Sequence, residues 1–176
     1  DFYKRVFLFY RETGVRLKEP MMSVLEGAWI DIPNTSKTKK GRNIELDKPL
    51  QSIFIELKDW CESGYGSTLL DKGADHISKK FKKALRCIGA DERKHFHSLR
   101  HTFAVRRLIQ GSRINTLKML MGHSSVTTTE VYSKMNLKRV AQDFPTIVTS
   151  YVNDAKIGKE DTILEDTIAL PMVYVS

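Results

Sequence analysis

The sequence predicts a mainly helical domain that carries a small antiparallel β-sheet, an α+β fold. From Pro49 onward, apolar residues recur three and four positions apart, which is typical of helices packed on a core. Two short stretches nearer the start alternate apolar and polar side chains, as half-buried strands do. The chain has 176 residues, of which 41% are hydrophobic, enough for one core. This composition excludes a disordered chain, and the length excludes a large multidomain protein.

The first expected element is a helix that begins near Phe2 and ends at Gly14. Phe2, Val6 and Phe9 lie at helical spacing, and glycine commonly follows the last turn of a helix. Because the chain starts within this helix, without an initiator methionine or a leader, we expect a further domain to precede it.

Residues 28–47 are expected to form a β-hairpin. Residues 29–32 and 44–46 alternate apolar and polar side chains, and the segment between them, NTSKTKKGR, is polar and basic. A flexible loop of this composition can reach a phosphate group. Its basic residues are Lys37, Lys39, Lys40 and Arg42.

Three helices are expected to follow, over residues 52–62, 74–89 and 98–111. Ser112 is positioned to cap a further helix that ends at Gly122. Ser124 or Ser125 is positioned to cap another over residues 126–135. These helices make the domain mostly α-helical.

The net charge of +8 is unevenly distributed along the chain. Residues 143–176 hold two lysines against six acidic residues, a net charge of −4, which leaves +12 on residues 1–142. Such a basic body suits a polyanion, because each phosphate that Lys or Arg neutralises releases condensed counterions. We therefore expect one domain over residues 1–142 and a distinct tail over 143–176.

No apolar run is long enough to span a membrane and no signal peptide is evident, so we expect a cytoplasmic protein. Cys61 and Cys87 lack the paired spacing of a zinc site and cannot form a disulfide framework. Redox chemistry is therefore not expected.

Four segments carry residues suited to phosphate chemistry. They are TGVRLKE with Arg16, the hairpin with Lys37, HSLRH with His97 and Arg100, and LMGHSSVTTTEVYSK with His123 and Tyr132. The HxxR spacing places His97 and Arg100 on one face of a helix. His95, His97 and His101 invite a reading as metal ligands, but no acidic third ligand is near and Arg100 would repel a cation. We therefore expect neither a metal nor a cofactor.

The order and spacing of these segments resemble the catalytic domain of the tyrosine recombinases, the family of phage integrases and Xer-type resolvases. The resemblance covers roughly residues 5–136. TGVRLKE resembles the family's first arginine box, HSLRHTFA its HxxR box, and LMGHSSVTTTEVYSK its histidine and tyrosine box. It implies that residues 1–142 adopt the tyrosine recombinase catalytic domain fold, with a separate helical core-binding domain before them.

Cleaving a DNA phosphodiester without a metal requires positive charge around the pentacovalent phosphorane. The planar forks of Arg16 and Arg100 are suited to supply this charge. The resemblance makes Tyr132 the nucleophile, which would form a 3′-phosphotyrosine link and release a 5′-hydroxyl. Glu19, three residues after Arg16, resembles the acidic partner of the first box and would orient Arg16.

The remaining roles concern protons and DNA contacts. Lys37 is the expected general acid for the departing 5′-oxygen, with Lys39 and Lys40 as alternatives. His97 and His123 can hydrogen-bond the phosphate or accept the tyrosine proton, and His97 is the better candidate for the base. Lys39, Lys40 and Arg42 are also expected to contact DNA; all three lie in or beside the hairpin loop.

The resemblance further implies the partners of the protein. It would bind double-stranded DNA and assemble as a homotetramer on two paired sites, with accessory DNA-bending proteins and strand exchange through a Holliday junction. The tail over 143–176 would pack on a neighbouring protomer, and the protein would be nucleoid-associated in a bacterium or encoded by a phage. Two alternatives share the fold, namely a monomeric type IB topoisomerase that relaxes DNA and a catalytically inactive DNA-binding module.

Overall fold

The structure is a computed structural model that describes residues 1–34, 41–64 and 70–123, together with residues 132, 136, 138, 140 and 142. The three predicted loop lysines, Lys37, Lys39 and Lys40, lie outside the described residues. So does the tail over 143–176, and so does the helix predicted over residues 126–135, apart from Tyr132.

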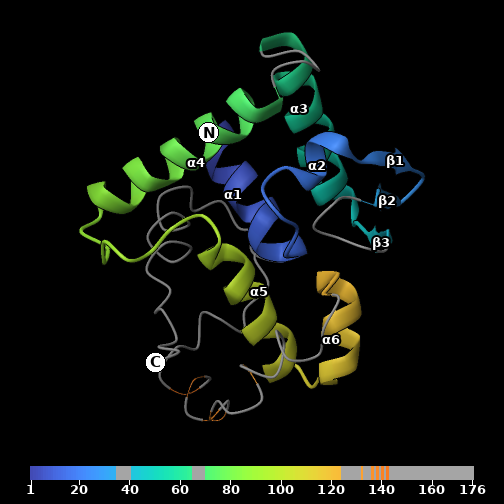
Figure 1. The fold of residues 1–176 in the computed structure, drawn as a ribbon, viewed down its shortest axis with the longest axis vertical. Helices are drawn as coiled ribbons and strands as arrows, with labels where there is room; N and C mark the ends of the chain where they lie inside the picture. Colours follow the sequence, from blue (N-terminus) through green and yellow to red (C-terminus); the bar gives the residue numbers. More distant parts are fainter. Residues whose placement is uncertain are drawn as a thin grey trace.

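The described residues form a helical body with a small sheet at one edge, which confirms the predicted α+β class (Figure 1). The helices are α1 (Phe2–Thr13), α2 (Glu19–Met22), α3 (Lys48–Gly64), α4 (Leu70–Cys87), α5 (Ser98–Ile109) and α6 (Ile114–Met121). The strands are β1 (Val24–Glu26), β2 (Trp29–Ile32) and β3 (Arg42–Glu45). No helix in this part of the chain is long and apolar enough to cross a membrane.

Helix α1 is the central element and contacts α3, α4 and α5. Val6, Phe9 and Tyr10 on its inner face are fully buried, as the helical spacing predicted. The helix ends at Gly14, whose φ of +64° suits glycine. A Cβ at Gly14 would overlap the ring of Phe103, so this glycine also lets α5 approach closely.

The predicted hairpin is present as β2 and β3, which pair antiparallel with Ile30 opposite Ile44. Ile30 and Ile32 face the core, whereas Trp29 is 46% exposed, so the predicted alternation holds along β2. The sequence did not predict β1, which pairs with the other edge of β2 to give the order β1-β2-β3.

The predicted helices after the hairpin are confirmed as α3 to α6, but one predicted cap is wrong. Arg113, not Ser112, is the residue before α6, and no side chain caps that helix. The Ser112 N–H instead donates to the Arg107 carbonyl at 2.9 Å, so Ser112 belongs to the turn that closes α5.

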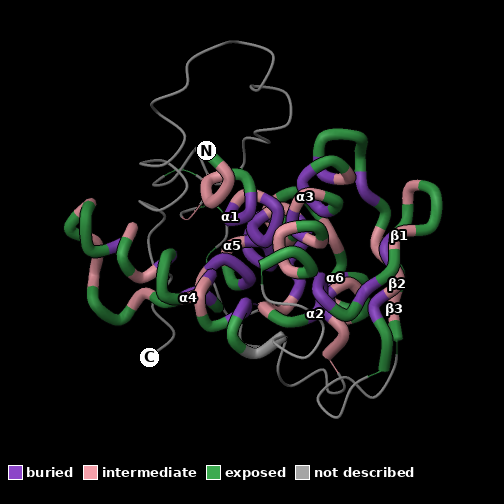
Figure 2. The backbone as a smooth tube through the Cα atoms, turned by 90° about the horizontal axis from the view of Figure 1, so that it is seen from above, coloured by how far each residue is buried: buried purple, intermediate pink, exposed green. Residues whose placement is uncertain are grey.

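The buried side chains form two clusters. The larger one joins α1, α3 and α4 to the sheet, and the smaller one joins α5 and α6 to Tyr132. Figure 2 shows buried residues along the inner faces of α1 and α5 and exposed residues along the outer side of α4. Helix α5 contributes to both clusters, so its first turns lie between the two halves of the body.

Candidate active site

Arg100, in the first turn of α5, is buried at the centre of the candidate site. Its Nη1 donates to the Gly14 carbonyl and its Nη2 to the Met121 carbonyl, so it joins the ends of α1 and α6. Its Nε has no hydrogen-bond partner among the described residues. Burial lowers the pKa of Arg100 to about 9, and the positive charge of Arg16 acts in the same direction. The guanidinium remains a cation at neutral pH and has donor capacity for an anion.

Arg16 lies between α1 and α2, within the electrostatic reach of Arg100. Its Nη1 donates to Glu19 Oε1 at 2.8 Å, its backbone N–H donates to Glu19 Oε2 at 2.6 Å, and its Nη2 donates to the Gly122 carbonyl at 3.3 Å. The side chain is still 25% exposed, so Arg16 is only partly covered by the protein. The two predicted arginines are therefore brought together in the folded chain.

Glu19 is 2% exposed and holds two arginines at once. Besides Arg16, its carboxylate accepts hydrogen bonds from both terminal nitrogens of Arg42, at 3.0 Å and 2.7 Å. Burial alone would raise the pKa of Glu19, but the hydrogen bonds and charge of Arg42, and then those of Arg16, lower it to about 2. Glu19 is therefore a buried anion in the predicted position beside Arg16.

Arg42 was predicted to contact DNA, and the structure shows it engaged within the protein. Its side chain is 7% exposed, and its Nε donates to the Leu120 carbonyl at 2.8 Å in addition to the two bonds to Glu19. A Cβ at Gly122 would lie 2.6 Å from Arg42 Nη1, so the space beside the guanidinium is filled. A DNA contact stays a prediction, while the described geometry makes Arg42 a link between β3, Glu19 and the end of α6.

The two predicted histidines flank the arginines. His97 is the residue before α5, and partial desolvation, then the charges of His101 and Arg100, lower its pKa to about 4. His123 follows the end of α6, and burial, then the charges of Arg100 and Arg16, lower its pKa to about 4. Both rings are therefore neutral at pH 7, and each can donate one hydrogen bond and accept another.

Tyr132 is 4% exposed and packs in the smaller core cluster. Its hydroxyl lies 2.5 Å from Nδ1 of His101, and the two ring centroids are 5.9 Å apart. Burial raises the pKa of Tyr132 to about 12, against the opposing charge of Arg100. Sequence reasoning considered His101 only as a metal ligand and missed this contact, although its position one turn after His97 places both rings on one face.

His95, His97 and His101 are not arranged as a metal site in the described part of the chain. No group of three His, Cys, Asp or Glu side chains there is placed to hold a metal ion. The rings of His95 and His97 are 6.4 Å apart between centroids, and those of His97 and His101 are 5.1 Å apart at nearly a right angle. Arg100 lies close enough to lower the pKa of His97 and His101 by its charge.

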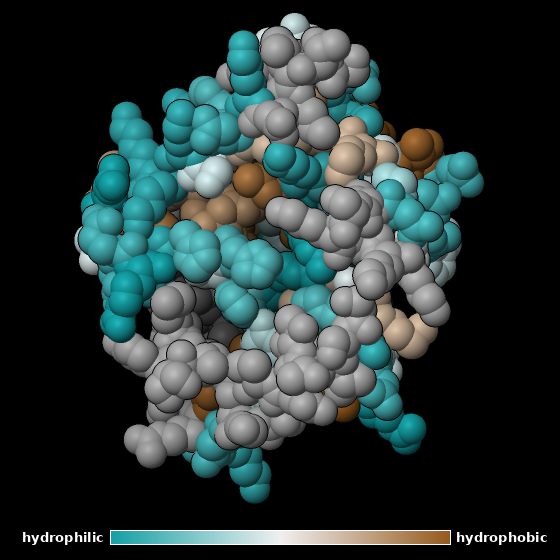
Figure 3. Space-filling model, in the orientation of Figure 1, coloured by the Kyte–Doolittle hydropathy of each residue, from teal (hydrophilic) through white to brown (hydrophobic). Residues whose placement is uncertain are grey.

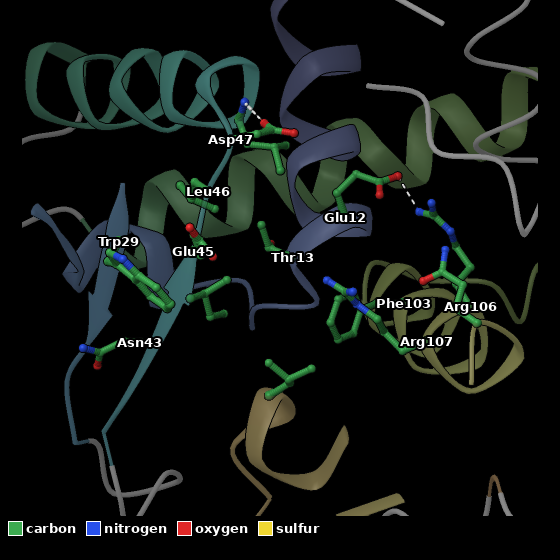
Figure 4. A pocket seen from close by; sticks show the side chains of 14 residues that line it. Glu12, Thr13, Trp29, Asn43, Glu45, Leu46, Asp47, Phe103, Arg106 and Arg107 are labelled. Carbon is green, nitrogen blue, oxygen red and sulfur yellow. Dashed lines mark hydrogen bonds and ion pairs between the residues drawn. The ribbon is translucent and has the colours of Figure 1, made fainter. Parts of the chain in front are cut away.

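A hollow lies between β3 and α5 (Figure 4). Trp29 and Glu45 line one side of it, and Phe103 and Arg107 line the other. Glu12 and Arg106 form an ion pair at its edge. None of the predicted catalytic residues that the structure describes lines this hollow, so it is distinct from the candidate site.

Fold and site together define a mainly helical domain in which two arginines, a buried carboxylate, neutral histidines and a buried tyrosine converge. The model of the phage integrase family matches residues 3–139. This match covers most of the chain, so the chain belongs to the phage integrase family.

Curated relatives agree with this assignment. The chain is 33% identical over 152 residues to the tyrosine recombinase XerC of Chlorobaculum parvum, a match that covers 73% of the chain and 44% of that protein. It is 33% identical over 149 residues to the tyrosine recombinase XerA of Saccharolobus solfataricus, covering 80% of the chain and 48% of that protein. The chain thus spans less than half the length of these relatives.

Solved structures show the same fold. A crystal structure of XerA recombinase matches with a TM-score of 0.58 at 21% identity, over 81% of the chain and 62% of that structure's chain. A XerH site-specific recombinase bound to a palindromic difH substrate, in a post-cleavage complex, matches with a TM-score of 0.56 at 22% identity, over 80% and 45%. The predicted tyrosine recombinase catalytic domain fold is confirmed.

Proposed function

We propose that this chain is the catalytic domain of a site-specific DNA recombinase that cuts and rejoins strands through a 3′-phosphotyrosine link on Tyr132. The observation that carries the proposal is the convergence of Arg16, Arg100, His123 and the hydroxyl-bearing Tyr132 from three separate segments. Two cations and neutral hydrogen-bonding rings around one nucleophile suit a phosphodiester, which is an anion that becomes more negative as it is attacked.

Each residue takes one step of the reaction. Arg100 and Arg16 bind the non-bridging oxygens, because a guanidinium offers parallel N–H donors to a phosphate. Tyr132 attacks phosphorus, the bond to the 5′-oxygen breaks, and the phosphate stays joined to the phenol oxygen. Lys37 supplies the proton to the leaving 5′-oxygen, and the reverse sequence rejoins the strand without ATP.

Glu19 and Arg42 support this reaction without touching the phosphate. The buried carboxylate of Glu19 accepts from the Arg16 side chain and backbone, which fixes the direction of that guanidinium. Arg42 neutralises the other side of Glu19 and reaches the Leu120 carbonyl, so the arrangement is tied to the end of α6. We expect the pair to preserve the position of Arg16, a role that does not depend on the predicted DNA contact of Arg42.

Double-stranded DNA is the proposed partner, bound by the basic body of the domain. Figure 3 shows one face on which the described side chains are mostly hydrophilic, with apolar groups in small patches. The XerH structure is described as bound to difH substrate, and a Tn1549 transposon integrase that shares the fold is described as bound to transposon DNA. Assembly as a homotetramer on paired sites, accessory DNA-bending proteins and association with a nucleoid are part of the same proposal.

The proposal is tested with a pool of nicked duplexes of random sequence, in EDTA, whose cut fragment diffuses away. Wild-type protein should become attached to DNA 3′ ends, and sequencing the retained DNA should report the target site. Tyr132→Phe should bind DNA equally but form no adduct. DNA binding without an adduct in the wild type would favour the inactive binding module instead.

Recombination and relaxation are separated with the site found in that way. Two linear duplexes that carry the site should yield exchanged products of new length if the protein is a recombinase. Relaxation of a supercoiled plasmid without any exchanged product would favour the topoisomerase alternative.

A further inference from the structure

We propose that Gly122, the residue after α6, is a positioning residue for the arginines of the candidate site. The inference rests on the proposed function, because it concerns the placement of the groups that would bind the phosphate. It starts from the end of α6, where three successive carbonyls each accept a hydrogen bond from a different arginine. The Leu120 carbonyl accepts from Arg42 Nε at 2.8 Å, the Met121 carbonyl from Arg100 Nη2, and the Gly122 carbonyl from Arg16 Nη2 at 3.3 Å.

The way α6 ends explains why these carbonyls are available to side chains. An α-helix leaves its last four carbonyls without a partner inside the helix. The closing turn satisfies two of them, because the Gly122 N–H donates to the Met119 carbonyl at 3.0 Å and the His123 N–H to the Lys118 carbonyl at 3.1 Å. Such a turn requires a left-handed residue, and Gly122 has a φ of +60°. The carbonyls of residues 120–122 are then left for groups from other segments, and the arginines take this place.

The arginines that meet at this helix end come from separate parts of the chain. Arg42 begins β3, Arg100 lies in the first turn of α5, and Arg16 lies between α1 and α2. After burial, the positive charges of Arg16 and Arg42 lower the pKa of Arg100, so the three cations lie within reach of one another. The C-terminal end of a helix carries a partial negative charge of about half an elementary charge, which favours cations there. The end of α6 therefore helps to hold three like charges together.

The absence of a side chain at Gly122 leaves room for one of these guanidinium groups. A Cβ there would lie 2.6 Å from Arg42 Nη1 and 3.1 Å from its Cζ. The Arg42 side chain is 7% exposed, so the guanidinium has little space into which it could move. Its Nη1 donates to Glu19 Oε1 at 3.0 Å, and the same oxygen accepts from Arg16 Nη1 at 2.8 Å. Gly122 thus places Arg16 in two ways, through its own carbonyl and through the room that it leaves for Arg42.

Gly89 provides the matched control, because it ends α4 with the same kind of turn. Its φ is +66°, its N–H donates to the Arg86 carbonyl at 3.1 Å, and the Ala90 N–H donates to the Leu85 carbonyl at 2.9 Å. No atom of the described residues that could obstruct a Cβ at Gly89 lies within 4 Å. Gly89→Ala therefore introduces the backbone strain of a left-handed residue without the contact on Arg42.

The first test is thermal unfolding, which needs no DNA. Gly122→Ala should lower Tm by about 3 °C or more beyond the loss in Gly89→Ala, because its Cβ also displaces Arg42. Arg42→Lys keeps the positive charge but removes Nη1, so in that background Gly122→Ala should cost no more than Gly89→Ala. Equal losses in the two alanine variants would overturn the inference. So would an extra loss at Gly122 that persists in the Arg42→Lys background, or failure of the double variant to fold where Arg42→Lys folds.

The second test measures single-turnover adduct formation on nicked duplexes that carry the target site. The scissile group is either the natural phosphate or a methylphosphonate, in which a neutral methyl group replaces one charged oxygen. Gly122→Ala should lower the rate on phosphate by about 10²-fold, because a small misplacement of binding groups is costly. The loss on methylphosphonate should be smaller, since the neutral group depends less on the arginines. Gly89→Ala should match the wild type on both duplexes.

The outcomes separate this inference from the proposed function. Absence of any adduct in the wild type contradicts the proposed function, while the unfolding comparison still tests the placement of Arg42 by Gly122. A wild-type adduct together with equal rates for Gly122→Ala and Gly89→Ala overturns the inference alone. An equal loss on phosphate and methylphosphonate in Gly122→Ala also overturns it, because a merely structural role would lower both rates by the same factor.

Discussion

At the scale of single residues, the site is organised around one buried anion. Glu19 receives hydrogen bonds from Arg16 and Arg42, and Arg100 lies beside this group with only backbone carbonyls as its described acceptors. Three guanidinium groups so close together would repel one another without Glu19. In the proposed reaction, the binding of phosphate by Arg16 and Arg100 thus depends on Glu19, a residue that we do not expect to touch DNA.

Replacing Glu19 by Gln should therefore destabilise the protein in a pH-dependent way. The pKa of Glu19 falls from 4.5 to about 2 on folding, which corresponds to about 3 kcal/mol of unfolding free energy. Because the folded pKa is depressed, this stabilisation is complete above pH 4.5 and is lost as the pH falls toward 2. Denaturant unfolding of both proteins from pH 7 to pH 2 measures the effect. A difference between them that stays constant with pH would contradict it.

The sequence predicted some of these contacts and not others, for a physical reason. Arg16 and Glu19 are three residues apart, so local spacing already indicated that they meet. Arg42 is 23 residues from Glu19, and only the pairing of β2 with β3 brings it there. The bond between His101 and Tyr132 spans 31 residues and likewise depends on tertiary packing. Sequence patterns report residue types at a site more readily than which of them touch.

At the scale of elements, helix periodicity and glycine positions account for most of what was predicted. The helix from Phe2 to Gly14 and helices α3 to α5 follow from apolar spacing over many residues. Strand β1 escaped prediction because its three residues are too few to show an alternation. The wrong cap at Ser112 has a similar cause, since the sequence alone does not show whether Ser112 or Arg113 precedes α6. The hydrogen bond from the Ser112 N–H to the Arg107 carbonyl places Ser112 in the turn that closes α5, so Arg113 precedes α6.

Two glycine substitutions test whether the end of α1 positions α5. Gly14 and Gly89 both have positive φ, at +64° and +66°, so alanine strains the backbone similarly at each, by about 1–2 kcal/mol. Only at Gly14 would the added Cβ also meet Phe103, whereas at Gly89 no atom of the described residues that could obstruct it lies within 4 Å. Thermal unfolding should show a larger loss of stability for Gly14→Ala than for Gly89→Ala, by about 1–3 kcal/mol. Equal losses would show that α5 can move aside.

At the scale of the whole molecule, charge is unevenly divided along the sequence. Residues 1–142 carry +12 and residues 143–176 carry −4. Affinity for duplex DNA should therefore depend steeply on salt, because neutralised phosphates release counterions. If about six phosphates are contacted, affinity should fall about 10³-fold between roughly 50 and 200 mM salt.

A filter-binding or fluorescence titration over this salt range measures that slope. Arg16→Ala should reduce the slope by about one, as expected for the loss of one phosphate contact. Binding that does not change with salt would contradict a phosphate-based interface.

The central claim is that Tyr132 forms a covalent bond to DNA in a site without a metal. The most direct measurement is mass spectrometry of the protein–DNA adduct formed in EDTA, after digestion of both the protein and the DNA. We predict a peptide that contains Tyr132 joined through phosphate to a 3′-terminal nucleotide. An adduct on any other residue, or one that forms only when a divalent cation is supplied, would contradict the account.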